Sequence, residues 1–241
     1  MTNQPDPLNF AHITDWVFDL DNTLYPHHSN LFSQIDVKMT GYVADLLKLS
    51  HTDARDLQKR FYKEYGTTLK GLMDRYDIDP DDFLQKVHDI DYSWLVPDPS
   101  LSTAIKQLPG RKFIFTNGDR GHAERAARQL GVLEQFDDIF DIRAAELTPK
   151  PARETYDRFL AMHKIDAASC VMFEDLARNL VVPKALGMTT VLIVPHNFEP
   201  TYSEIWERDP GNTDHVDYVT DELAAFLDAI LPRQVKRSEP V

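Results

Sequence analysis

Short apolar runs alternate along this chain with longer stretches in which apolar residues recur at helical spacing. Five runs are typical of strands and a weaker sixth follows them; they lie at 13–20, 112–116, 138–142, 169–173, 189–194 and 215–219. Some of them, such as Phe-Ile-Phe at 113–115, are apolar at successive positions, which is typical of strands covered on both faces. Strands that alternate with helices predict an α/β fold with a doubly wound, Rossmann-like parallel sheet. Gly187 is expected to end the helix that precedes the fifth strand.

The stretch 27–99 departs from this alternation, because it has no strand-like run and its apolar residues repeat at helical spacing. We expect it to form a small all-helical cap domain, inserted after the first strand of an α/β core made of residues 1–26 and 100–241. Ligands of open α/β sheets bind beyond the carboxyl ends of the strands. An insert that leaves from the end of the first strand would therefore lie over the binding site as a lid.

The chain is acidic, with a formal net charge of −13 over 241 residues. Sequence-independent binding to nucleic acid requires Lys and Arg to neutralise phosphates, so this charge argues against nucleic acid or an anionic membrane as a partner. No run approaches the about 18 apolar residues of a membrane span, and the N-terminus lacks a signal-peptide pattern, so we expect a cytoplasmic protein. The single cysteine, Cys170, lies in an apolar run and is expected to pack as a small hydrophobic residue.

Two carboxylates follow the first predicted strand, in the segment Asp19-Leu-Asp21. If the strand alternation continued through this segment, both side chains would face the same side. Two carboxylates at one spot repel each other unless a cation or a shared proton compensates, and this cost points to a functional site. Taken alone, the pair also fits a solvated acidic loop.

Groups that can bind phosphate follow the second strand, in Thr116-Asn117-Gly118. A hydroxyl and the backbone N–H groups of a glycine-containing turn can hold phosphate oxygens, although Asn-Gly is also a common turn. Lys150, which precedes Pro151, could add a positive charge. An isolated lysine is more often a solvated surface residue.

Acidic residues also end the fourth strand, where Glu174 and Asp175 are followed by Asn179. Oxygen ligands of this kind suit a hard cation such as Mg²⁺, and a helix N-cap is the alternative interpretation. In a parallel sheet the carboxyl ends of the strands meet at one edge. The combination therefore favours a common site over separate surface features.

At these residues the sequence resembles the haloacid dehalogenase (HAD) superfamily of phosphatases. The resemblance covers nearly the whole chain and includes the four family motifs in order. They are matched by Asp19-x-Asp21-Asn-Thr23, Thr116, Lys150 and Glu174-Asp175-x-x-x-Asn179.

Within that superfamily the chain resembles the pyrimidine 5'-nucleotidase-like branch. The phrases that carry this resemblance are Asp21-Asn-Thr-Leu-Tyr-Pro26, Tyr65-Gly-Thr-Thr-Leu-Lys-Gly-Leu72, Thr116-Asn-Gly118 with His122-Ala123, and Leu176-Ala-Arg-Asn179. The fourth motif departs from its relatives, because Glu174 stands where they often have Asp. Either Glu174 or Asp175 could then reach a metal, and the spacing to Asn179 favours Asp175.

The resemblance implies a Mg²⁺-dependent phosphomonoesterase that acts on a small phosphorylated metabolite, a nucleoside monophosphate in this branch. Asp19 would attack phosphorus and form an aspartyl-phosphate. Asp21 would protonate the leaving oxygen and then activate the water that releases phosphate.

The resemblance also implies the groups that bind the metal and the phosphate. Mg²⁺ would be held by Asp19, the backbone carbonyl of Asp21, and Asp175. Asn179 would contact these ligands rather than the metal itself. Thr116, the amide of Asn117 and Lys150 would stabilise the phosphate oxygens. We expect the protein to act as a monomer or a homodimer.

Three alternatives stay open at this point. The substrate could be phosphoglycolate, a sugar phosphate, FMN or pyridoxal phosphate. A 2-haloacid dehalogenase fits less well, because halide leaves without protonation and would not need the acid at Asp21. A non-catalytic phosphate-binding module on the same fold is the third.

Further residues could belong to the site or to the surface. His27, His28, Arg120 and His122 could line the cleft, although an exposed or capping position is the simpler expectation for each. Tyr65, Thr67, Thr68 and Lys70 could form a substrate-contacting loop of the cap or a plain helix connection.

Overall fold

The computed structural model describes residues 5–196 and 213–231, and these contain one six-stranded parallel sheet. The strands are β1 (Asp15–Phe18), β2 (Arg111–Phe115), β3 (Asp138–Phe140), β4 (Cys170–Glu174), β5 (Thr189–Ile193) and β6 (Tyr218–Thr220). Their spatial order is β3-β2-β1-β4-β5-β6, which is the order of a doubly wound Rossmann-like sheet. The predicted α/β fold is confirmed.

The first strand is shorter than predicted, because it ends at Phe18 rather than at residue 20. The N–H of Asp19 still donates to Phe173 O at 2.9 Å, and the chain then turns, with Asn22 at a positive φ of 60°. The condition under which Asp19 and Asp21 would face the same side, a strand that continues through both residues, is therefore not met. Asp19 prolongs β1 by one bond, and Asp21 lies in the turn.

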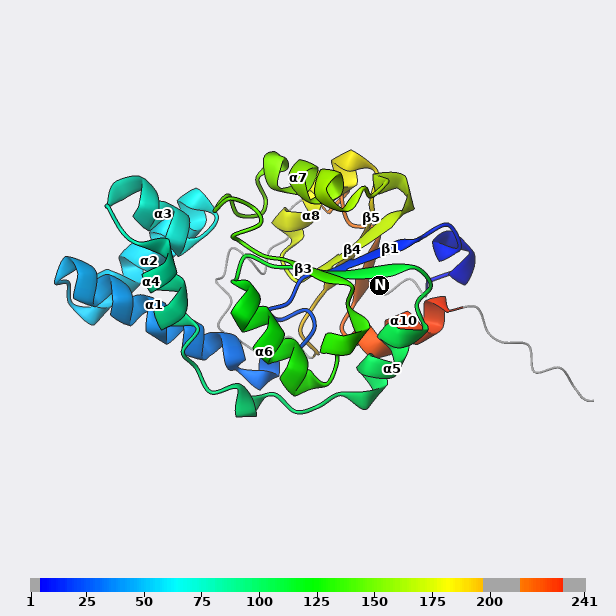
Figure 1. The fold of residues 1–241 in the computed structure, drawn as a ribbon, viewed down its shortest axis with the longest axis horizontal. Helices are drawn as coiled ribbons and strands as arrows, with labels where there is room; N and C mark the ends of the chain where they lie inside the picture. The colour runs from blue at the N-terminus through cyan, green and yellow to red at the C-terminus, as the bar shows by residue number, and fades with distance from the viewer. Residues whose placement is uncertain (1–4, 197–212, 232–241) are drawn as a thin grey trace, which may run out of the picture.

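Helices cover both faces of the sheet (Figure 1). One face packs against α5 (Pro99–Gln107), α6 (Arg120–Leu130) and α10 (Leu223–Ile230), and the other packs against α7 (Arg153–His163) and α8 (Ala177–Leu186). Residues of β1 alternate between the two faces as the pleat requires, since Trp16 and Phe18 join the first cluster and Val17 joins the second. Gly187 ends α8 in the left-handed conformation, as predicted.

Residues 27–99, all of which are described, contain helices and no strand. The helices are α1 (Leu31–Leu47), α2 (His51–Tyr65), α3 (Thr68–Arg75) and α4 (Pro80–Val87), and they gather beside the sheet in Figure 1. They share a hydrophobic cluster of their own, to which Ile142 is added from outside. The division into a cap domain and a core stays a prediction; residues 1–4, 197–212 and 232–241 of the predicted core lie outside the described residues.

Single turns of 3-10 helix join these elements. They are η1 (Pro7–Phe10), η2 (His27–Ser29), η3 (Tyr92–Trp94), η4 (Leu133–Gln135) and η5 (Ala167–Ser169). Two of them, η2 and η3, lie in the chain segments that enter and leave the helices α1–α4.

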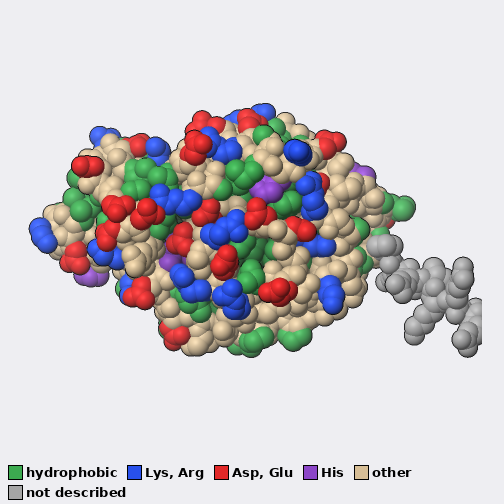
Figure 2. Space-filling view, in the orientation of Figure 1, with side chains coloured by type: hydrophobic (Ala, Val, Ile, Leu, Met, Phe, Trp, Pro, Cys, Tyr) green, Lys and Arg blue, Asp and Glu red, His purple; other side chains and the backbone are tan. Residues whose placement is uncertain are grey.

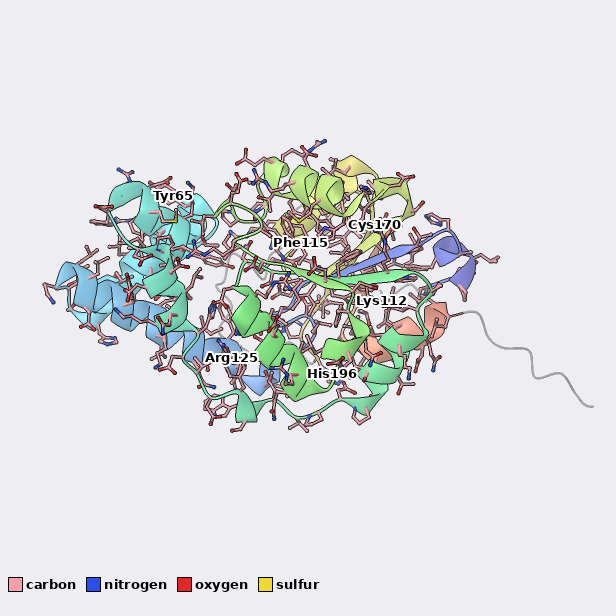
Figure 3. All side chains as sticks on the ribbon, in the orientation of Figure 1. Tyr65, Lys112, Phe115, Arg125, Cys170 and His196 are labelled. Carbon is pink, nitrogen blue, oxygen red and sulfur yellow. The ribbon has the colours of Figure 1, made fainter. Side chains whose placement is uncertain are left out.

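Charged side chains of both signs are interspersed over the face of the molecule in Figure 2, and no broad positive patch stands out there. None of the helices in residues 5–196 and 213–231 is both long enough and apolar enough to cross a bilayer. Cys170 is buried in the part of the molecule that contains the sheet, whereas Tyr65 lies among the helices α1–α4 (Figure 3). The prediction that Cys170 packs as a small hydrophobic residue is confirmed.

Gly71 tests the packing of α3 on α2. A Cβ at this position would lie 2.5 Å from Cβ and Cγ of the buried Phe61. Replacing a helical glycine with alanine favours the helix by about 1 kcal/mol, but overpacking of this kind costs about 1–3 kcal/mol. We expect Gly71→Ala to lower the free energy of unfolding, measured by urea denaturation.

Gly41 in α1 is the matched control, because no atom lies within 4 Å of the position of its Cβ. Gly41→Ala should raise the free energy of unfolding by up to about 1 kcal/mol. Equal stabilisation by both substitutions would show that α2 and α3 do not pack as described.

Candidate active site

The carboxyl ends of the strands face a pocket that is bounded on its other side by the helices α1–α4. Most of the predicted site residues line this pocket together; they are Asp19, Asp21, Asn117, Lys150 and Asp175, with Glu174 beside them. Thr116 does not line it. Its hydroxyl accepts a hydrogen bond from the N–H of Gly118 at 2.9 Å, and Gly118 reaches the pocket in its place.

Lys150 lies at the base of the pocket and is 1% exposed. Its ammonium donates to Asp19 Oδ1 at 2.7 Å, to Phe115 O at 2.8 Å and to Glu174 Oε2 at 3.2 Å, so each of its three N–H groups has an acceptor. Burial alone would lower the pKa of Lys150, but the charges of Asp19 and Glu174 outweigh it and raise the pKa above its usual value. Lys150 is therefore a fixed positive charge at the site, rather than a solvated surface lysine.

Asp19 is held on both of its oxygens. Oδ1 accepts from Lys150, and Oδ2 accepts from the hydroxyl of Thr23 at 3.2 Å. Burial raises the pKa of Asp19, Lys150 opposes that rise, and the neighbouring charge of Asp21 adds to it. These contacts keep the carboxylate of Asp19 beside the ammonium of Lys150 at the carboxyl end of β1.

A second carboxylate, Glu174, shares the same ammonium. Burial raises the pKa of Glu174 and the charge of Asp19 raises it further, against the effect of Lys150. One ammonium thus faces two buried carboxylates, with Asp175 close by. The site has more negative than positive charge, and an additional cation would relieve the imbalance.

The donor set fits such a cation. One carboxylate oxygen from each of Asp19, Glu174 and Asp175 lies within 4.8 Å of the others. Asn179 donates through Nδ2 to Glu174, and its Oδ1 is buried with no hydrogen-bond partner among the described residues. Hard oxygen donors of this kind suit Mg²⁺. Both Glu174 and Asp175 are within reach of the cluster, so the choice between them as the ligand stays a prediction.

Asp21 is held by two residues that the motif reasoning did not assign to it. The hydroxyl of Tyr25 donates to Oδ1 of Asp21, and Nε2 of His122 lies 2.9 Å from the same oxygen. Burial would raise the pKa of Asp21, but the charge of His122 and the hydrogen bonds from His122 and Tyr25 lower it below the usual value.

His122 is completely buried rather than placed at the pocket entrance or on the surface. It lies in the first turn of α6, where its N–H donates to the N-cap residue Asp119 at 2.8 Å. Its neighbour Arg120 is exposed and pairs with Asp138 instead. The only signal for His122 in the sequence was its place just after the second motif.

Asn117 positions the loop that carries Lys150. Its Oδ1 accepts from the N–H of Lys150 at 2.8 Å, and its Nδ2 donates to Lys150 O at 3.4 Å. The side chain of Asn117 therefore joins the ends of two loops, a role that the motif pattern did not indicate. Its predicted role, binding phosphate through the backbone amide, stays a prediction.

The entry to α1 brings a histidine into the pocket. Nε2 of His27 lies 3.6 Å from Oδ2 of Asp175, and His27 lines the pocket while His28 is exposed. The simpler expectation of an exposed side chain is therefore wrong for His27 and confirmed for His28.

The helices α2 and α3 contribute part of the predicted loop. Thr67 and Thr68 line the pocket. Tyr65 and Lys70 do not: Tyr65 accepts a hydrogen bond from Arg75 at 2.7 Å, and Lys70 pairs with Asp74 at 2.8 Å.

A buried polar cluster on the helices lines the far wall of the pocket, and sequence reasoning missed it. The carboxylate of Asp36 accepts from Arg55 at 2.6 Å, from Gln58 at 2.7 Å and from Lys59 at 2.7 Å. Asp36, Gln58 and Lys59 line the pocket among mostly apolar neighbours, which include Ile35, Met39, Phe83 and Leu84. Only the packing of α1 against α2 brings these residues together, so no motif signals them.

Comparisons with known proteins identify related sequences and folds. A sequence profile of the haloacid dehalogenase-like hydrolases matches residues 17–187. "Phosphate metabolism protein 8" of Saccharomyces cerevisiae is 31% identical over an alignment of 237 residues, which spans 91% of this chain and 72% of the yeast protein. The predicted resemblance to the superfamily is confirmed.

Solved structures share the fold at low identity. An L-2-haloacid dehalogenase from Xanthobacter autotrophicus has a TM-score of 0.56 and 14% identity, with 90% of this chain and 98% of the dehalogenase covered. A putative HAD-hydrolase from Bacillus subtilis, bound to magnesium, has a TM-score of 0.56 and 15% identity, with the same shares covered. A haloacid dehalogenase-like family protein from Streptococcus pneumoniae has a TM-score of 0.57 and 14% identity, with 91% of this chain and 99% of that protein covered.

The fixed charge of Lys150 generates a prediction about stability. Lys150→Met leaves Asp19 and Glu174 buried without their counter-charge, which should lower the free energy of unfolding by about 3–5 kcal/mol at pH 8 in EDTA. The pKa of Glu174 is raised in the folded protein, so this carboxyl binds a proton over a pH range in which it is ionised in the unfolded chain. The free energy of unfolding therefore falls as pH rises above 4.5, the usual pKa of a glutamate side chain. The difference in free energy of unfolding between the wild type and Lys150→Met should therefore become smaller as pH is lowered from 8 to 5. Both free energies are measured by urea denaturation.

Lys184→Met is the control, because Lys184 is 39% exposed and pairs with Asp217 at the surface. Lys184→Met should lower the free energy of unfolding by less than about 1 kcal/mol, and this loss should change little over the same pH range. A deficit in Lys150→Met that grows on acidification would contradict the charges described here.

Proposed function

The chain belongs to the haloacid dehalogenase-like hydrolases, and from that premise we propose that it is a Mg²⁺-dependent phosphomonoesterase with Asp19 as its nucleophile. The observation that carries the proposal is the arrangement around Asp19. This carboxylate lies in a pocket beside a buried ammonium and two further carboxylates, with Asp21 held separately by its own hydrogen-bond donors. Asp21 is the feature that favours phosphoryl transfer over halide release, because an alcohol leaving group needs a proton and a halide does not.

The reaction would proceed in two displacements. An oxygen of Asp19 forms a bond to phosphorus while the bond to the leaving oxygen breaks, and Asp21 gives that oxygen a proton. Asp21, now a carboxylate, takes a proton from water as the water attacks phosphorus and frees Asp19. The starting state is restored, with alcohol and inorganic phosphate released.

Magnesium would supply positive charge that shields the attacking carboxylate from the phosphate. Asp19, the backbone carbonyl of Asp21, and Asp175 are the proposed ligands, with Glu174 at hand, and the related hydrolase from Bacillus subtilis is described as bound to magnesium. The amide of Asn117 is proposed to bind phosphate oxygens. Thr116 does not line the pocket, and its hydroxyl is proposed to hold the turn that presents this amide. The N–H groups of Lys150 are directed to three protein acceptors, so we propose that it helps through its charge and by orienting Asp19.

We propose that the helices α1–α4 form the cap domain. The leaving group would occupy the part of the pocket that these helices enclose. A mostly apolar wall with a few polar groups suits a ring system with some hydrogen-bonding atoms. Lys59 and Gln58, which donate to Asp36, are polar groups of that wall, and the ring carbonyl oxygens of UMP and CMP are acceptors that suit such groups. We therefore propose pyrimidine nucleoside monophosphates as the substrates.

The nucleophile can be tested directly. Asp19→Asn removes the attacking oxygen, so turnover of UMP, CMP and p-nitrophenyl phosphate should fall by on the order of a thousandfold or more. Released phosphate is measured at steady state with Mg²⁺ present.

Asp157→Asn, an exposed residue of α7 that pairs with Arg153, is the control and should keep wild-type activity. EDTA should abolish wild-type activity, and added Mg²⁺ should restore it. Wild-type protein that hydrolyses none of these phosphates with Mg²⁺ would refute the phosphatase proposal, and undiminished activity of Asp19→Asn would refute the nucleophile.

The substrate class can be tested at the far wall. Lys59→Met removes a donor 2.7 Å from Asp36, so kcat/KM for UMP and CMP should fall by about 10-fold, the cost of one hydrogen bond to a charged group. Lys38→Met is the matched control, since Lys38 pairs with the exposed Asp89 at 3.5 Å outside the pocket. Higher wild-type kcat/KM for phosphoglycolate, sugar phosphates, FMN or pyridoxal phosphate than for UMP and CMP would replace the proposed substrate class.

A further inference from the structure

We infer that His122 and Tyr25 are positioning residues that fix one carboxyl oxygen of Asp21 and leave the other for the leaving group. This inference rests on the proposed phosphatase function, in which Asp21 transfers the proton. It concerns two residues that lie outside the motif positions assigned to the chemistry.

Both contacts converge on the same atom. The hydroxyl of Tyr25 donates to Oδ1 of Asp21, and Nε2 of His122 lies 2.9 Å from that oxygen. The structure shows no hydrogen bond to Oδ2 from any residue that it describes, and Asp21 lines the pocket. Two bonds to Oδ1 fix the rotation of the carboxyl group, so Oδ2 is the oxygen available to a substrate.

Tyr25 is suited to act as a permanent donor. It is 1% exposed, and its hydroxyl lies beside the carboxylate of Asp21. A carboxylate oxygen accepts and the hydroxyl donates, and the only described acceptor of this hydroxyl is Oδ1 of Asp21.

His122 is itself held from three sides. Nδ1 lies 2.9 Å from the hydroxyl of Tyr92, and the ring stacks on that of His88 with centroids 4.4 Å apart and planes 9° from parallel. Asp119 accepts from the N–H of His122 and also contacts Nδ1 of His88. The hydroxyl of Tyr92 also donates to His88 O at 3.2 Å, so it can accept from Nδ1 of His122. A carboxylate oxygen only accepts, so the contact with Oδ1 of Asp21 places a ring proton of His122 on Nε2.

This geometry decides which atom carries the transferable proton. With Oδ1 accepting from two donors, a proton on Asp21 resides on Oδ2. It passes from there to the leaving oxygen as the bond from phosphorus to that oxygen breaks and its electron pair stays on the oxygen. Loss of either donor frees the carboxyl to rotate and reduces the fraction of molecules with Oδ2 in place.

Two aryl phosphates of similar shape separate this role from a general defect. Phenolate is a strong base, as the pKa of about 10 for the tyrosine hydroxyl indicates, so it needs a proton as it leaves. Nitrophenolate is a weak base and leaves without one. We expect Tyr25→Phe and His122→Leu each to lower kcat/KM for phenyl phosphate by about 10-fold or more, and for p-nitrophenyl phosphate by less than about 3-fold.

The parameter kcat/KM is used because it reports the steps up to departure of the leaving group, before the water step that both substrates share. His122→Gln keeps an N–H donor near the position of Nε2 and should return the ratio of the two kcat/KM values toward that of the wild type. Tyr25→Phe removes one oxygen and keeps the ring, so the test does not depend on the folding of His122→Leu.

His163→Gln and Tyr42→Phe are the matched controls. Nε2 of His163 lies 3.1 Å from Asp138, and the hydroxyl of Tyr42 donates to Asp82 at 3.2 Å, both outside the pocket. Both variants should keep the wild-type ratio. Equal losses on both aryl phosphates in Tyr25→Phe and His122→Leu, no loss on either, or a ratio in His122→Gln equal to that of His122→Leu would overturn the inference. A wild type that hydrolyses neither ester would instead refute the proposed function.

Discussion

The buried ammonium of Lys150 joins the carboxyl ends of three adjacent strands. It contacts Asp19 after β1, Phe115 O at the end of β2 and Glu174 at the end of β4. These strands are neighbours in the sheet, with β1 between the other two. A buried ion pair adds little net stability, but removal of one partner lowers the free energy of unfolding strongly. The ammonium of Lys150 therefore requires its three acceptors to lie together at this edge of the sheet.

The sheet order explains why the pocket opens where it does. In a doubly wound sheet the crossovers leave on opposite faces from the central strands, which opens a crevice at their carboxyl ends. The helices α1–α4 follow β1 directly and reach across that crevice, so the polar cluster around Asp36 faces the carboxylates of the sheet edge. In the proposed function, the reacting groups lie on the sheet and the leaving group is selected by the helices α1–α4.

The sequence predicted the fold and the residues that follow each strand, because apolar runs and the polar residues at their ends are local patterns. Asp19, Lys150 and Glu174 could be placed at one edge by that reasoning. His122 could not be placed beside Asp21, because its burial depends on how α6 packs beneath the loop after β1. The cluster of Asp36 with Lys59 depends in the same way on the packing of two helices, which leaves no trace in spacing along the chain.

The return segment of the helical insert carries two groups of the neighbourhood of Asp21. His88 follows the last residue of α4, and Tyr92 opens η3, so the stack on His122 comes from chain that precedes residue 99. A chimera that exchanged α1–α4 for the helices of a relative would therefore need its downstream joint between Val87 and His88. A joint at residue 99 would exchange the four helices and would also remove His88 and Tyr92, which hold His122 beside Asp21.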